Sequence, residues 1–172
     1  MTGPATGPAR RRTLFTRWRE QTHPDDAAAI YGTIVTTAVI GATSSKSAQT
    51  VLELAVGTLL VFWLAHVYAM ALARHLQGAR LHWSAISHAM AEERPMLEAP
   101  IPSLVVLLLG AVGVLDDRLA VTVALLVGVG QLVGWGIAYA RSQDWGWPMA
   151  LAAGVVNGMF GLAVVILEVA LH

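Results

Sequence analysis

Residues 119–140 read LAVTVALLVGVGQLVGWGIAYA, an uninterrupted run of 22 residues with no charged side chain. A helix needs roughly 20 mostly apolar residues to cross the roughly 30 Å hydrocarbon core of a bilayer. Inside that core every backbone N–H and C=O must be bonded within the protein, and a helix meets this need along its whole length. The run therefore predicts a membrane-spanning helix.

The composition extends this prediction to the whole chain. Of the 172 residues, 56% are hydrophobic and 13% are charged, whereas soluble domains are about 25% charged. We therefore predict an all-α polytopic membrane protein whose solvent is the lipid bilayer. Eleven basic and eleven acidic residues cancel, so no basic surface indicates nucleic acid as a partner. The absence of cysteine excludes disulfides and thiolate metal sites.

Five apolar segments follow one another, which predicts about five transmembrane helices. The first and third segments are short for a span, and a proline lies in the first turn of the fifth. The expected spans are 27–43, 50–73, 101–115, 119–140 and 148–171. The predicted organisation is a basic tail with an interfacial segment (1–26), two spans (27–73), an amphipathic loop helix (74–100) and three further spans (101–172).

The loops divide the basic residues unevenly between the two sides of the membrane. With five spans, one side holds nine Lys and Arg residues and the other holds two, so we predict a cytoplasmic N-terminus in the plasma membrane. If segment 101–115 were re-entrant, the count of nine basic residues against two would not change. We prefer a full span, because this segment offers few polar groups to satisfy the backbone of a re-entrant loop. The nine are Arg10, Arg11, Arg12, Arg17, Arg19, Arg74, Arg80, Arg94 and Arg141, and the two are Lys46 and Arg118.

Glycines at a spacing of four predict close helix contacts in the last two spans. Such patterns let backbones approach one another, either within the chain or in a homo-oligomer. The residues are Gly130 and Gly134 in the fourth span, and Gly154, Gly158 and Gly161 in the fifth.

Carboxylates gather at the predicted outer rim. Glu53 and Glu168 each lie about one turn inside a span, and Asp116 and Asp117 lie in the outer turn. These groups could form a mouth that attracts cations. Because their depth is shallow, we favour the simpler interpretation that the two glutamates reach out to water.

Three polar residues lie deeper. Gln131 and Asn157 are about 18 Å and 13 Å from the ends of their spans, which places both near the midplane. We expect an interhelical amide hydrogen bond, with a polar wall of a permeation path as the alternative. For His66 we expect a hydrogen bond to a threonine or tyrosine of the first span, and a functional role is the alternative.

The loop stretch 81–94 is rich in histidine and glutamate. His88 and Glu92 are four residues apart on one helix face, a spacing that suits half of a divalent-metal site. Trp83, Ile86 and Met90 share another face. We favour a different interpretation, an amphipathic helix that lies on the membrane surface.

The segments YGTIVTTAVIGA and LAHVYAMALARHL, with five spans and a carboxylate-bearing cytoplasmic element between the second and third, resemble the vacuolar-iron-transporter family. The resemblance covers residues 30–95 and implies exchange of a divalent metal for protons. The chain departs from the family's pattern in two places. Tyr31 stands where the family has an aspartate before glycine, and His66 stands at the acidic position of its second helix.

Two classes of function remain open. The first is transport of protons or a divalent cation through the bundle, with His66, Gln131 and Asn157 along the path. The second is a membrane scaffold that packs with itself or a partner through its glycine faces. No sequence signature of an enzyme is present, so we do not expect one.

Overall fold

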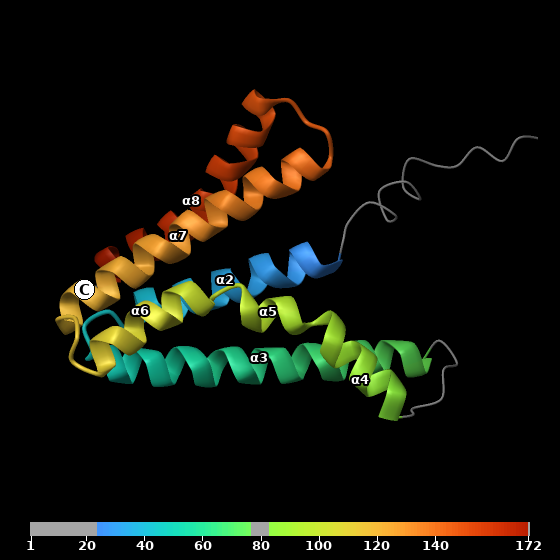
Figure 1. The fold of residues 1–172 in the computed structure, drawn as a ribbon, viewed down its shortest axis with the longest axis horizontal. Coiled ribbons are helices and arrows are strands. Elements are labelled where there is room, and N and C mark those ends of the chain that lie inside the picture. Colours follow the sequence, from blue (N-terminus) through green and yellow to red (C-terminus); the bar gives the residue numbers. More distant parts are fainter. Residues whose placement is uncertain (1–23, 77–82, 172) are drawn as a thin grey trace, which may run out of the picture.

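The structure is a computed structural model that describes residues 24–76 and 83–171. Every regular element in these two ranges is an α-helix (Figure 1), which confirms the predicted all-α bundle. The predicted basic tail, up to residue 23, lies outside the described residues. The helices are α2 (Pro24–Ala42), α3 (Ala48–Leu76), α4 (Trp83–Glu92), α5 (Arg94–Glu98), α6 (Ile101–Ala111), α7 (Asp117–Ser142) and α8 (Trp147–Leu171).

The apolar helices coincide with the five predicted segments. Three stretches are long and apolar enough to cross a membrane, namely Ala48–Leu76, Arg94–Ala111 and Asp117–Ser142. Two shorter apolar helices, Ala27–Ala42 and Trp147–Ala163, correspond to the first and fifth segments. The chain is thus a membrane protein built from a helix bundle.

Successive apolar segments run in alternating directions through the bundle (Figure 1). We call the end where α2 begins the proximal end, and the end where α2 turns into α3 the distal end. The end of α3, α4 and the α7–α8 turn lie towards the proximal end, and the α6–α7 turn lies at the distal end. The third segment runs from one end towards the other, and α8 finishes at the end opposite to the start of α2.

The third segment is longer than the sequence predicts, and it is broken. Residues 94–100, expected to belong to the loop, form α5 and a turn that continues into α6. Met96 and Pro100 are fully buried, and Ala99 between them is 9% exposed. Pro100 and Pro102 interrupt the helical hydrogen bonding between α5 and α6 because proline has no N–H to donate. The short predicted span therefore gains its length from α5.

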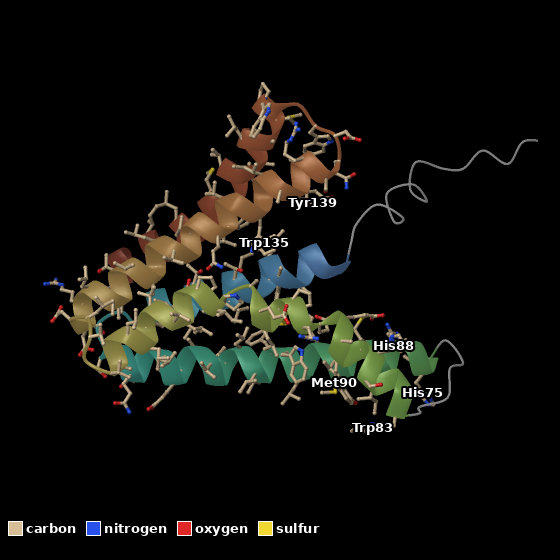
Figure 2. The ribbon with its side chains drawn as sticks, viewed as in Figure 1. His75, Trp83, His88, Met90, Trp135 and Tyr139 are labelled. Atoms are coloured by element: carbon tan, nitrogen blue, oxygen red, sulfur yellow. The ribbon has the colours of Figure 1, made fainter. Side chains whose placement is uncertain are left out.

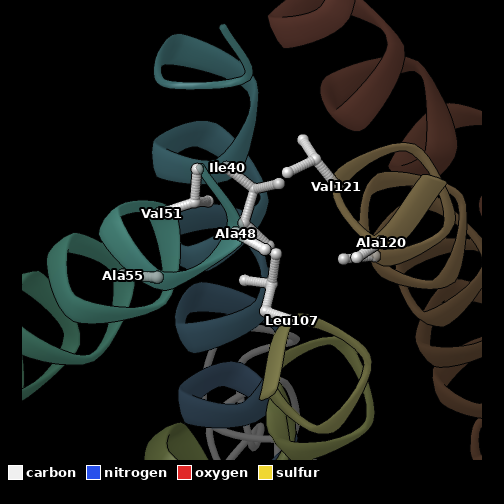
Figure 3. Packing of buried hydrophobic residues seen from close by; sticks show 8 residues of the cluster. Ile40, Ala48, Val51, Ala55, Leu107, Ala120 and Val121 are labelled. Carbon is white, nitrogen blue, oxygen red and sulfur yellow. The ribbon is translucent and has the colours of Figure 1, made fainter. Parts of the chain in front are cut away.

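The distal end holds the main apolar core (Figure 3). Side chains of α2, α3, α6 and α7 meet there. Small residues dominate the α3 and α7 contributions, so the four helices approach closely. The cluster consists of Ile40, Ala48, Val51, Ala55, Leu107, Ala120, Val121 and Ala124.

Helix α2 is the central element, because it packs against α3, α5, α7 and α8. Two contacts leave no room for a side chain. A Cβ at Gly32 would overlap the carbonyl oxygen of Met96 in α5, and a Cβ at Gly128 of α7 would overlap the Thr37 hydroxyl. Gly32 thus lets two helix backbones touch, and Gly128 makes room for the Thr37 side chain.

Within the described chain, the predicted glycine contacts are present on α8 and absent on α7. Gly154, Gly158 and Gly161 lie against α7, since a Cβ at each would fall within 3.0 Å of an α7 atom. Gly130 and Gly134 face open space instead, where a Cβ would have no atom within 4 Å. The buried face of α7 repeats every four residues through other positions, namely Ala120, Ala124, Gly128, Leu132, Gly136 and Ala140.

The contrast between glycines gives a test of the packing. Gly32→Ala should lower the free energy of unfolding by about 1–3 kcal/mol, because the added methyl group meets a backbone oxygen that cannot move aside. Gly130→Ala should change it by no more than about 0.5 kcal/mol. Thermal unfolding of both variants in detergent measures the difference, and equal effects would contradict the α2–α5 contact.

Candidate functional site

Most of the fully buried polar side chains lie on α2, whose contact with α7 we call the α2–α7 seam, and Thr37 packs there against Gly128. Thr33, Thr36 and Thr37 of α2, which lie in the predicted first span, are each only 1% exposed. Beside them, Ser103 of α6 is equally buried, and Gln131 of α7 is half-buried. We call these five residues the polar layer.

Two hydroxyls of the polar layer have no partner. Thr33 donates to the carbonyl of Ala29 at 2.9 Å, the usual bond of a threonine inside a helix. The Oγ1 atoms of Thr36 and Thr37 are buried and form no hydrogen bond with any described residue. Since an unsatisfied buried hydroxyl costs about 1–3 kcal/mol, this arrangement leaves two polar groups able to bind water or a solute.

Gln131 forms hydrogen bonds at the break between α5 and α6 in the third span. Its Nε2 donates to the carbonyl oxygen of Ala99, which the break leaves without a helical partner, and its Oε1 accepts a bond from the Ser103 hydroxyl at 3.1 Å. Irregular backbone at membrane depth is tolerated where the protein satisfies it. The expected bond between Gln131 and Asn157 is therefore replaced by bonds to α5 and α6.

At the proximal end, the seam opens into a cleft of about 560 Å³ between α2 and the α7–α8 hairpin. We call it the proximal cleft. Tyr139, labelled on α7 in Figure 2, lines it together with Asn157, and the remaining lining is mainly apolar. Thus Asn157 faces a cleft rather than another amide. The other lining residues are Ala27, Ile30, Gly136, Trp145, Met149, Ala152, Ala153 and Val156.

At the distal end, the same seam opens into a second cleft of about 640 Å³, the distal cleft. Polar side chains from the α2–α3 turn and the start of α7 form most of its wall. The lining residues are Ser44, Ser45, Lys46, Ser47, Asp117, Arg118, Val121, Thr122 and Leu125.

The two clefts therefore lie at opposite ends of one helix contact. On α7, Leu125 lines the distal cleft and Gly136 lines the proximal cleft, which are about 16 Å apart along the helix axis. The Thr37–Gly128 contact lies between them. Fully buried side chains flank this contact along the two helices, with Ile40 of α2 towards the distal cleft and Leu132 of α7 towards the proximal cleft.

His66 lies off the seam. It is on α3, which lines neither cleft. Its ring packs against the Tyr31 ring with centroids 4.8 Å apart, and its Nδ1 lies 3.1 Å from the carbonyl oxygen of Phe62 in the same helix. The expected contact with a tyrosine of the first span is present, but it is a ring contact, and the expected threonine bond is not formed.

The carboxylates of the distal end have structural partners. Asp116 caps α7 by accepting bonds from the N–H groups of Arg118 and Leu119, and Asp117 Oδ1 accepts a bond from the N–H of Ala48 at the start of α3. Glu53 is exposed and accepts a bond from Gln49 at 3.0 Å. The side chain of Glu168 lies outside the described residues.

The two residues of the predicted metal half-site on α4, His88 and Glu92, lie in different surroundings. Glu92 forms an ion pair with Arg74 at the end of α3, whereas His88 is exposed to solvent. Figure 2 places His88, Trp83 and Met90 around α4 at the proximal end, and all three are exposed. Within residues 24–76 and 83–171, no group of three or more His, Asp or Glu side chains could hold a metal ion.

Sequence reasoning missed the residues that define the seam. From the sequence, the threonines of the first span are expected only as possible partners for His66, and Lys46 and Arg118 serve only to predict orientation. The signal that could have found the seam is the run of small residues every fourth position in α7, opposite the threonines of α2.

Comparison with known proteins finds no match, since no family model, curated protein or solved structure is significantly similar to this chain.

Proposed function

We propose that this chain is a membrane transporter in which protons cross along the α2–α7 seam. The observation that supports the proposal is the presence of a cleft at each end of one helix contact, with two unpartnered hydroxyls between the clefts. A carrier needs access from both faces and a barrier between them. The Thr37–Gly128 contact and the flanking Ile40 and Leu132 side chains supply that barrier.

Protons suit the chemistry of the seam. A hydroxyl both donates and accepts a hydrogen bond, so Thr36 and Thr37 can relay a proton through water held between them. A divalent cation, which the resemblance to vacuolar iron transporters implies, would meet Lys46 and Arg118 at the distal cleft. These two cations repel a divalent ion about twice as strongly as a singly charged proton, so the proton is the ion we favour.

Reconstituted liposomes test this proposal. The double variant Thr36→Val/Thr37→Val should lose proton flux, because it removes both relay groups with little change in side-chain shape. Thr33→Val is the matched control, since Thr33 is equally buried on the same helix but its hydroxyl bonds to its own backbone. An internal pH-sensitive dye reports flux, with K⁺ and valinomycin balancing the charge.

His66→Ala should leave the flux unchanged, because His66 lines neither cleft. Flux that persists in the double threonine variant, or that disappears in His66→Ala, would contradict a path along the seam. Mn²⁺ flux without proton flux would contradict the choice of ion. Thermal unfolding of each variant confirms that it is folded.

The orientation is part of the proposal, with the proximal end in the cytoplasm of the cell and the chain in the plasma membrane. The excess of basic residues in the proximal loops supports it. Alkaline phosphatase fused after His172 should then be active outside the cell, and the same enzyme inserted in the turn 143–146 should be inactive. The opposite pattern would reverse the orientation.

A second candidate function is assembly through the exposed face of α7. Gly130 and Gly134 leave this face flat, with no neighbour within the described chain, and Leu126 beside them is 66% exposed. Such faces allow close contact between transmembrane helices. A second copy of the chain is the partner we propose for it.

Light scattering of the detergent-solubilised protein tests this assembly. Gly130→Leu should shift the protein towards monomer, because the added side chain separates the helix backbones. Gly57→Leu is the matched control on α3, where a Cβ also has no atom within 4 Å. An equal oligomeric mass in the two variants would remove the α7 face as the interface.

A further inference from the structure

The distal cleft contains both of the basic residues that the sequence places outside the predicted cytoplasmic side. Lys46 lies in the α2–α3 turn and Arg118 in the first turn of α7, 72 positions apart in the chain. Both line the same cleft. Because Lys and Arg are sparse on that side of membrane proteins, the convergence of the two on one cleft calls for a functional explanation.

Neither cation has a partner. No described residue forms an ion pair or a hydrogen bond with the Lys46 ammonium or the Arg118 guanidinium group. The described arginines of the proximal end differ in this respect. Arg74 pairs with Glu92, Arg94 pairs with Glu98, and Arg141 donates to the Trp145 carbonyl.

The acidic residue of the cleft is already engaged. Asp117 lines the cleft, but its Oδ1 accepts the N–H of Ala48 at 3.0 Å and so faces the positive end of the α3 dipole. Asp116 caps α7 with its Oδ2 in the same way. These two carboxylates stabilise helix ends, and the two cations remain available to a ligand.

Hydroxyl groups complete the cleft. Ser44 and Ser45 form no side-chain hydrogen bond with the described residues, whereas Ser47 bonds to Thr50 and Thr122 donates to the Arg118 carbonyl. A guanidinium group offers a planar fork of N–H donors, and an ammonium group offers three more. Two cations and two free hydroxyls match the several oxygen acceptors of a phosphate group.

We propose that the distal cleft binds a phosphate group, presented either by inorganic phosphate or by the headgroup of a phospholipid. The Arg118 guanidinium and the Lys46 ammonium neutralise its charge, and Ser44 and Ser45 donate to its remaining oxygens. The site needs only the distal cleft, so it exists whether or not protons cross the seam. Failure of the transport assay and failure of phosphate binding are therefore separate results.

Calorimetric titration of the full chain in neutral detergent with sodium phosphate tests the site at constant ionic strength. Lys46→Gln and Arg118→Gln should each weaken binding by about tenfold or more, since each removes a charge-assisted hydrogen bond. Arg94→Gln, which removes a partnered cation at the other end, should leave binding unchanged. Asp117→Asn keeps an acceptor for Ala48 and removes a negative charge, so it should tighten binding.

A second measurement identifies the source of the phosphate. The protein is purified from nanodiscs of phosphatidylglycerol or of phosphatidylcholine, and the phospholipids that it retains are counted by native mass spectrometry. Lipid retention lost in Lys46→Gln and Arg118→Gln, but kept in Arg94→Gln, supports a headgroup. Phosphate binding with the same dependence supports the free anion. If neither ligand shows this dependence, the site does not exist.

Discussion

The backbone contacts of α2 determine how the other helices are arranged. Gly32 touches the α5 backbone at Met96, and Thr37 lies directly over Gly128 of α7. In lipid there is little hydrophobic drive to bring helices together, so association depends on close packing and on hydrogen bonds. A central helix with glycine contacts on two sides therefore fixes where the third and fourth spans lie, and the seam and its clefts follow from that placement.

These contacts also explain why a broken span is tolerated. Residues 94–100 lie against α2, so the turn between α5 and α6 is enclosed by protein. The carbonyl of Ala99 would still lack a partner at this depth, and Gln131 supplies one. The same residue engages Ser103, so one side chain connects α5, α6 and α7. Gln131, a polar residue near the midplane, therefore has a structural role and not the place on a permeation path that its depth suggests.

Sequence reasoning found the segments and misjudged several contacts, for a physical reason. Length and hydropathy are local properties, so the sequence predicts all five apolar segments, four of them within a few residues and the third without the seven residues that precede α6. Gly130 and Gly134 are four residues apart and Gly128 and Gly136 are eight apart, so each pair marks one face of α7, but spacing does not say which face meets a neighbour. The partner of Gln131 could not be predicted either, because the sequence places residues 94–100 in the loop and not in the third span.

The two ends of the seam differ in ways that constrain any movement. At the distal end, Asp117 joins the start of α7 to the start of α3. The apolar core that contains Ile40 packs the four helices together at this end. At the proximal end, the α7–α8 hairpin diverges from α2 and leaves the cleft open (Figure 1). A carrier that alternates between its faces must separate the distal cluster and close the proximal cleft. In a bilayer this separation loses packing contacts but carries no penalty for exposing apolar surface to lipid. The Asp117–Ala48 bond joins the starts of α7 and α3, so in the transport that we propose this bond opposes separation of the helices at the distal end.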